Sequence, residues 1–286
     1  MDGVLLKTAV DKFARSTHAL PDRDLEREWE WQEYDEGVRF AFFRTYEELR
    51  ELAVDLGAER AAGEDPRTKA QRALAQYHAA YRDLQAILFE VSDDRSGDLP
   101  IEGEWPLSRV LYHIIRTERS FFGITSYAVD RFRSNDSQDV EMPEEAWNAF
   151  WAGDPFRQMG ENEPLSTLLA YYDTLHRRIL NDFANLTDDE LEAPSRFWES
   201  NPMPVQFRLH RFDSHLRQHT IQIEKTLAAL DLNPNEARRL LRLIYAALAE
   251  VEGLQIGAKA PGMEQIQTVG EQIAQRAEEI DSVLAG

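Results

Sequence analysis

Apolar residues recur at alternating steps of three and four positions through most of this 286-residue chain. This spacing places apolar side chains on one face of a helix and is typical of the helix seams that pack together in a bundle. The clearest run lies between residues 67 and 92 and consists of Leu74, Tyr77, Tyr81, Leu84, Leu88 and Val91. Runs of alternating β-branched residues bounded by turns, the pattern of strands, hardly occur. The sequence therefore predicts an all-α protein.

Four consecutive segments with this pattern predict a four-helix bundle within residues 67–232. The helices are expected at 67–92, 106–133, 165–186 and 204–231. Pro106 opens the second helix, because proline is favoured at the first helical position. The connection between the second and third helices is long for a bundle and carries Trp147 and Trp151, so we expect it to fold over one end of the helices. We interpret the four segments as an up-down-up-down bundle.

Both ends of the chain carry helical segments outside this bundle. One is predicted at 38–56, and two more at 236–255 and 263–284. We therefore expect residues 1–66 to form an N-terminal helical extension and residues 233–286 to form a C-terminal helical hairpin. The apolar face of the hairpin needs a partner, either the bundle or a second subunit, and we favour a homodimer.

Acidic residues dominate the charge of the chain. It has 52 Asp and Glu against 32 Lys and Arg, a formal net charge of −20, and the excess is spread along its length. Binding to nucleic acid or to anionic membranes requires clustered Lys and Arg, so we expect neither as a partner. No run of about 18 apolar residues occurs, and residues 1–20 lack the apolar core of a signal peptide. We expect a cytoplasmic protein that acts on a small molecule.

The chain has no cysteine. A metal ion would therefore be held by His, Asp or Glu. Among the histidines only His215 and His219 have the spacing of paired ligands, because four positions along a helix place their Cβ atoms within about 6 Å on one face. A metalloprotease is excluded, since its motif needs Glu directly after the first histidine and Leu216 stands there. The alternative to a metal site is a pair of hydrogen-bonded or solvent-edge histidines.

His113, on the second predicted helix, is the candidate third ligand. In an up-down-up-down bundle the second and fourth helices run parallel across the core. His113 lies 113 − 106 = 7 residues into its helix and His215 lies 215 − 204 = 11 residues into its own. Their depths then differ by about 6 Å at 1.5 Å per residue, so the three rings are expected to meet. A single histidine satisfied within an apolar core is the alternative.

Other residues fit a metal site less well. Surface or edge positions are predicted for the remaining histidines, His18, His78, His176 and His210. Glu118 follows His113 by five residues, which turns it about 140° away around the helix. We therefore predict that Glu118 forms an ion pair with a neighbouring arginine.

Two stretches resemble the metal-binding helices of the DinB-like family of damage-inducible proteins, which is distinct from the DNA polymerase of that name. The segment GEWPLSRVLYHIIRTER at 103–119 is similar to the family's second helix, where a tryptophan opens a helix with a metal-ligating histidine. The segment HLRQHTIQI at 215–223 is similar to the fourth helix, where two ligand histidines precede a Gln-Ile pair. The resemblance covers about residues 67–232.

This resemblance implies a divalent metal, zinc or nickel, on a triad formed by His113, His215 and His219. Relatives include thiol S-transferases that use mycothiol or bacillithiol, a mycothiol-dependent isomerase and proteins described as metal-dependent hydrolases. The implied function is a metal-dependent transferase that joins a low-molecular-weight thiol to a small electrophile. A chain without cysteine is compatible with a nucleophile that arrives on a cosubstrate. The alternatives are a metal-dependent hydrolase and a non-catalytic bundle that binds a metal or a small molecule.

Four further residues are expected around the pocket. Gln222 lies one turn past His219 and is expected to orient a ligand or a bound water. Thr117 lies on the same helix face as His113. Trp147 and Trp151, in the long connection, are expected to roof the pocket.

Overall fold

The computed structural model describes residues 3–136, 141–259 and 262–286. Its contacts divide the chain into two compact units. One comprises residues 68–80 and 91–232, and the other comprises residues 1–67, 81–90 and 233–286. The division falls within one helix, after Ala80. In the described ranges, no helix is both long enough and apolar enough to span a membrane.

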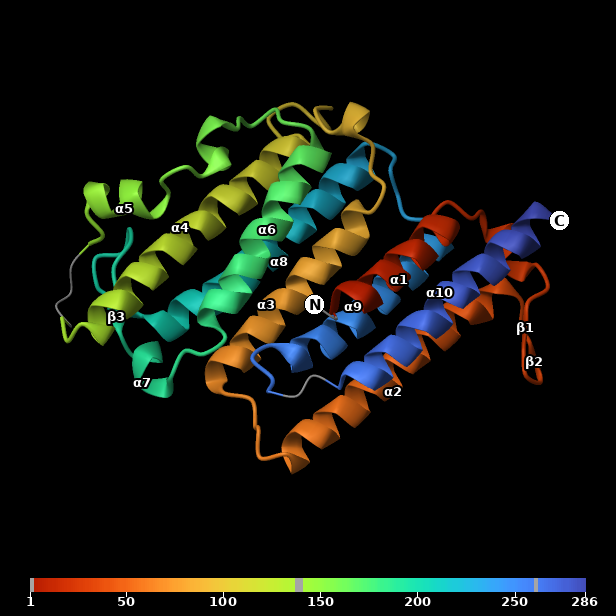
Figure 1. Cartoon of the computed structure of the whole chain (residues 1–286). Coiled ribbons are helices and arrows are strands. Elements are labelled where there is room, and N and C mark those ends of the chain that lie inside the picture. The colour runs from red at the N-terminus through yellow and green to blue at the C-terminus, as the bar shows by residue number, and fades with distance from the viewer. Residues whose placement is uncertain (1–2, 137–140, 260–261) are drawn as a thin grey trace. The chain divides into compact units, whose positions relative to one another are not determined.

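The first unit is a four-helix bundle, which confirms the predicted all-α architecture. Its helices are α3 (Lys69–Leu88) as far as Ala80, α4 (Leu107–Arg133), α6 (Leu165–Phe183) and α8 (Val205–Ala229), and they lie side by side in Figure 1. They correspond to the four segments predicted from apolar periodicity. Pro106, Pro164 and Pro204 directly precede α4, α6 and α8. A proline at a helix start costs no hydrogen bond, because the first N–H groups have no partner within the helix.

The order of helix directions differs from the predicted up-down-up-down arrangement. His113 near the start of α4 lies against His219, whereas Phe121 further along α4 lies against Phe212, so α4 and α8 are antiparallel. Glu118 on α4 contacts Tyr172 on α6, and Phe122, further along α4, contacts Phe183, further along α6. Helices α4 and α6 are therefore parallel. Helix α3 is antiparallel to α6, since Gln71 donates a hydrogen bond to the carbonyl of Ala184 and His78, further along α3, contacts His176. The directions are therefore up-down-down-up.

The connection between α4 and α6 explains this order, because it returns along the length of α4 instead of closing one end of the bundle. It contains α5 (Glu144–Phe150) and a 3-10 turn, η3 (Pro155–Gln158). Successive residues of the connection contact successively earlier residues of α4, in the pairs Trp147 with Gly123, Trp151 with Phe122, Phe156 with Tyr112, and Glu161 with Arg109. The next helix therefore starts at the same end as α4.

Arg119 fixes this connection on α4. Its guanidinium group lies 4.1 Å from the ring centre of Trp151 and pairs with Asp154 at 3.1 Å. Gly123 makes room beside it, since a Cβ atom there would lie 2.9 Å from the Trp147 ring. Both contacts are with side chains of the connection, so the course of this segment depends on α4.

A short hairpin precedes α8 and lies beside the site described below. Its strands β3 (Pro194–Ser195) and β4 (Met203–Pro204) are antiparallel, with Ser195 opposite Met203, and they follow α7 (Asp188–Leu191). Arg208 on α8 is fully buried and holds the hairpin through two hydrogen bonds to Glu199, of 2.6 and 2.8 Å, and two to Ser195, of 3.0 and 3.3 Å. The short turn η2 (Asp93–Arg95) lies in the connection that leads to α4.

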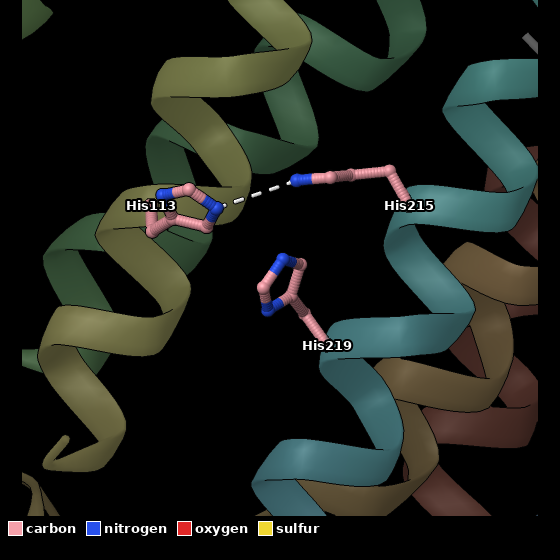
Figure 2. Close-up of side chains that lie close together, drawn as sticks. All are labelled: His113, His215 and His219. Atoms are coloured by element: carbon pink, nitrogen blue, oxygen red, sulfur yellow. Dashed lines mark hydrogen bonds between the residues drawn. The ribbon is translucent and has the colours of Figure 1, made fainter. Parts of the chain in front are cut away.

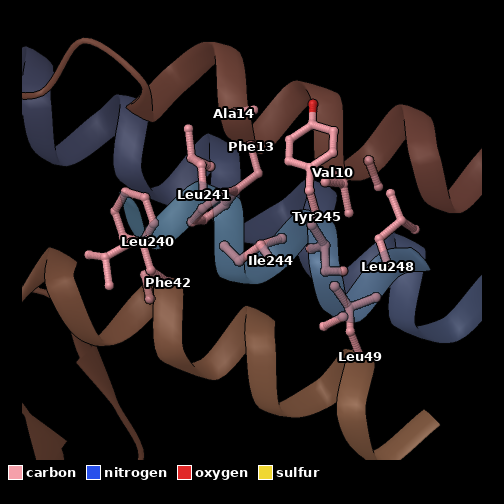
Figure 3. Packing of buried hydrophobic residues seen from close by; sticks show 14 of the residues in the cluster. Val10, Phe13, Ala14, Phe42, Leu49, Leu240, Leu241, Ile244, Tyr245 and Leu248 are labelled. Atoms are coloured by element: carbon pink, nitrogen blue, oxygen red, sulfur yellow. The ribbon is translucent and has the colours of Figure 1, made fainter. Parts of the chain in front are cut away.

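The second unit joins helices from both ends of the chain. Its helices are α1 (Gly3–Thr17), α2 (Val38–Ala62), α9 (Glu236–Gln255) and α10 (Met263–Ala285), with the turn η1 (Asp22–Glu26) and the short strands β1 (Glu30–Trp31) and β2 (Tyr34–Asp35) between α1 and α2. Helix α1 packs on α10, and α2 packs on α9. Figure 3 shows their shared core, where Phe13 and Phe42 meet Leu241, Ile244 and Leu248.

The C-terminal hairpin was expected to pack on the bundle or on a second subunit, and its helices pack on α1 and α2. Helix α1 was not anticipated, although Leu6, Val10 and Phe13 have helical spacing and are fully buried. Buried polar contacts also join the two ends, since Arg276 on α10 donates hydrogen bonds to Glu48 and Thr45 on α2. The terminal segments therefore bury their apolar faces against one another.

Candidate metal centre

Three histidines from two helices converge in the bundle unit. His113 comes from α4, and His215 and His219 come from consecutive turns of α8 (Figure 2). One ring nitrogen from each lies within 4.8 Å of the other two. The Nε2 atoms of His113 and His215, joined by the dashed line in Figure 2, are 3.4 Å apart. Sequence reasoning thus selected three residues that the fold brings together.

The position of each histidine follows from the helix that carries it. Phe212, Leu216 and Ile223 on α8 are fully buried, and His215 and His219 border this apolar line on the side that faces α4. Both are buried, whereas His113 is half-buried. The two histidines on α8 are therefore shielded from solvent, and the triad is accessible on the side of His113, near the start of α4.

The arrangement fits a divalent transition metal. Nitrogen ligands at 2.0 to 2.1 Å from a tetrahedral ion lie about 3.4 Å from one another, which is the separation of the His113 and His215 nitrogens. Burial lowers the pKa of His215 to about 3, and burial also lowers the pKa of His113. These two imidazoles are consequently neutral at pH 7, the form that binds a metal. In the described ranges, no other group of three or more His, Asp or Glu side chains lies close enough together to share an ion.

Gln222 orients one member of the triad. Its Oε1 atom accepts a hydrogen bond from Nδ1 of His219 at 2.8 Å. A hydrogen on Nδ1 leaves the lone pair on Nε2, so this contact selects the tautomer that presents Nε2 as a ligand. The sequence predicted that Gln222 orients a ligand or a bound water. In the structure its partner is the ring of His219.

Removal of this hydrogen bond should weaken metal binding without removing a ligand. We expect Gln222→Ala to lower zinc affinity by about 10- to 100-fold, the usual cost of losing a group that orients a metal-binding histidine. Competition with a chromophoric chelator measures the change. Gln218→Ala, an exposed position on the same helix, is the matched control and should keep wild-type affinity. Equal affinities for the two variants would contradict the assigned role.

Aromatic side chains form the walls beside the triad. The ring of Trp105 lies 5.4 Å from that of His113, and the ring of Phe121 lies 5.8 Å from that of His215. Trp198, on the hairpin before α8, packs against Phe121 at 6.2 Å and is 61% exposed. These walls restrict the imidazole rings and leave an exposed apolar surface next to them.

The predicted roof residues lie elsewhere. Trp151 is buried against Phe122 and Phe150, and Trp147 packs on Trp151. Their place follows from the return of the connection along α4. Thr117 lies one turn past His113 and is half-buried. A small cavity of about 140 Å³ does adjoin His113, and its lining consists of Trp105, Arg109, Tyr112, His113, Arg116 and Glu161.

Two histidines predicted at the surface are in fact buried. His78 on α3 and His176 on α6 lie in the bundle core, with their Nδ1 and Nε2 atoms 2.9 Å apart. The two rings form a hydrogen bond between α3 and α6. The apolar spacing within a single helix cannot reveal such a pair. His210 is exposed, as predicted, and His18 is half-buried against carbonyl oxygens of its own helix.

The predicted ion pair of Glu118 is also wrong. Its side chain is fully buried and accepts hydrogen bonds from the hydroxyl groups of Tyr77 and Tyr172, the latter at 2.7 Å. Burial raises the pKa of Glu118 to about 8, and the two tyrosines only partly offset this effect. The carboxyl group is therefore largely protonated at pH 7. It belongs to the polar core of the bundle.

Together, these features define a class of helical-bundle proteins with a candidate metal site built from histidines on facing helices. A family model described as the DinB superfamily matches residues 76–223, which include the whole triad. The match covers just over half of the chain, and this protein belongs to the DinB superfamily. No curated protein and no solved structure matches the chain.

Proposed function

We propose that this protein is a metal-dependent transferase that joins a low-molecular-weight thiol to a small electrophile. His113, His215 and His219 would hold the metal, zinc or nickel. The observation that carries the proposal is the convergence of three imidazole nitrogens within 4.8 Å, at a place accessible from the start of α4. Membership of the DinB superfamily supports it as well.

The donor set suits this chemistry. A divalent ion held by three neutral imidazoles keeps its full charge and an open position, which lowers the pKa of a thiol or water bound there. The chain has no cysteine, so the nucleophilic sulfur would come from a cosubstrate. Gln222 holds the tautomer of His219, and Trp105 and Phe121 limit the motion of the other two rings. The exposed ring of Trp198 offers an apolar surface to the electrophile.

Two alternatives use the same site. In a metal-dependent hydrolase, water would take the place of the thiol. In a non-catalytic binding protein, the triad would hold a metal or a metal–ligand complex without turnover. The three functions differ in whether a reaction occurs and whether it needs a thiol.

Turnover assays separate these functions. Protein stripped with a chelator and reloaded with zinc or nickel is incubated with an epoxide, an α-haloketone and an activated ester, with and without cysteine or a cysteinyl sugar. We expect product only when thiol is present, and its loss in a His215→Ala variant. Hydrolysis without thiol would favour the hydrolase. Metal binding without turnover of any compound would favour the binding protein and contradict the transferase.

A further inference from the structure

Two arginines flank the triad, one on each helix that builds it. Arg116 follows His113 by three residues on α4, and Arg211 precedes His215 by four residues on α8. Within the described part of the chain neither forms an ion pair. Two acidic side chains near them have other partners: Glu161, which lines the same cavity as Arg116, pairs with Arg109 at 3.1 Å, and Asp213, two residues after Arg211, pairs with Arg217 at 2.7 Å.

In the described structure neither arginine has a carboxylate partner although the protein is acidic, and Arg211 donates a hydrogen bond to the hydroxyl group of Ser214 at 3.2 Å. Asp and Glu outnumber Lys and Arg by 52 to 32, so acidic partners are abundant. Each arginine lies about one turn from a triad histidine on the same helix, and Arg116 lines the same cavity as His113. In the described part of the chain, two positive charges without an ion pair therefore stand beside the triad.

A cavity connects one of these arginines to the triad. Arg116 and His113 line the same space of about 140 Å³, and Trp105 and Arg109 line it as well. The guanidinium group of Arg109 is stacked at 4.6 Å on Trp105 and neutralised by Glu161, so it forms a wall. A water molecule occupies about 30 Å³, so the space accommodates a group of several heavy atoms.

We propose that the thiol or electrophile used at this site carries a carboxylate group, and that Arg116 binds it in the cavity beside His113. The inference rests on the proposed function and names the substrate class of that site. A guanidinium group binds a carboxylate through two parallel hydrogen bonds, which fixes orientation as well as charge. Arg211, on the opposite helix, adds to the attraction without lining the cavity. Arg116 is thus a specificity-determining residue.

Ligand binding to cobalt-loaded full-length protein tests this inference without relying on turnover. The probes are 3-mercaptopropionate and its neutral amide, 3-mercaptopropionamide, and the thiolate-to-cobalt absorption band reports dissociation constants. We expect the carboxylate to bind at least about tenfold more tightly than the amide, the usual effect of one charge-assisted pair. In Arg116→Gln the preference should fall to about twofold or less, with amide binding unchanged. Arg211→Gln should reduce the preference to a smaller extent.

Matched variants and probes keep the outcomes distinct. Arg177→Gln, at an exposed ion pair on α6, is the control and should keep the wild-type preference. Binding of acetate and of acetamide, each followed by the change in the cobalt spectrum, measures the preference for a carboxylate when no thiol is present. If cobalt binds and neither thiol gives an absorption band, the transferase fails, and a preference for acetate that depends on Arg116 would still support the inference. A carboxylate preference that is unchanged in Arg116→Gln would overturn it, whatever the effect of Arg211→Gln.

Discussion

Replacement of His215 by alanine is expected to abolish stoichiometric metal binding. His215 is the most deeply buried member of the triad, and its Nε2 atom is 3.4 Å from that of His113. Without it, two nitrogens remain, too few for the three protein ligands of a catalytic zinc site. After dialysis against zinc, elemental analysis should give about one equivalent for the wild type and less than about 0.1 for the variant.

A second histidine on the same helix provides the control. His210 is exposed, and His210→Ala should bind about one equivalent of zinc as the wild type does. Circular dichroism of both variants checks that α8 is intact. Full retention of metal by His215→Ala would remove the triad as the site, and so would a wild type that takes up no zinc, nickel or cobalt.

Replacement of Glu118 by glutamine should change how stability depends on pH. Burial raises the pKa of Glu118 from 4.5 to about 8 in the folded protein. Between these values the folded state keeps a proton that the unfolded chain has lost. The contribution of this group is therefore fully present below pH 4.5 and is lost as pH rises toward 8, at a slope of at most about 1.4 kcal/mol per pH unit.

Glutamine keeps a neutral polar group in the same place and removes this titration. Tyr77 and Tyr172, the two hydrogen-bond partners of Glu118, can still bond to an amide. The free energy of unfolding of Glu118→Gln, relative to the wild type, should therefore rise by several kcal/mol between pH 5 and pH 8. Urea unfolding of the metal-free full chain, at one-unit pH intervals, measures the difference.

Glu192→Gln serves as the reference for this comparison, because Glu192 is an exposed carboxylate of the same unit. Its stability relative to the wild type should stay constant over the same pH range. A constant difference for Glu118→Gln as well would show that the buried carboxyl group titrates with an ordinary pKa. The comparison between variants cancels the contributions of the triad and of other titrating groups.

The bundle helices could be predicted because each buries a continuous apolar stripe. In α6, Leu168, Leu175 and Ile179 have this spacing and are buried. The direction of α6 could not be predicted, because it depends on how the preceding connection packs. That course is fixed by contacts of Arg119 and Gly123 with tryptophans distant in sequence.

The metal-site residues were predicted on a partly wrong premise. The predicted depths of the histidines apply to parallel second and fourth helices, whereas α4 and α8 are antiparallel. The triad still forms, because His113 lies 113 − 107 = 6 residues after the first residue of α4 and His219 lies 229 − 219 = 10 residues before the last residue of α8. At 1.5 Å per residue these depths differ by about 6 Å, as they did in the parallel arrangement.

The polar core was missed for a different reason. Glu118, His78 and His176 look like surface residues in sequence, because charged and polar side chains are rarely buried without partners. Their partners come from other helices, as with Tyr77 and Tyr172 around Glu118. Such pairs depend on which helix faces lie together, and apolar spacing within one helix does not contain that information.

The union of both chain ends in one unit has a consequence for synthesis on the ribosome. Helices α1 and α2 are made before their packing partners α9 and α10, which end at Gln255 and Ala285. At 5 to 20 residues per second, the 285 − 62 = 223 residues after α2 take about 10 to 45 seconds to translate. During that interval α1 and α2 lack the helices α9 and α10 that cover their apolar faces, whereas the last helix of the histidine-bearing bundle is complete at Ala229. We therefore expect the apolar faces of the nascent α1 and α2 to stay exposed longer than those of the bundle helices.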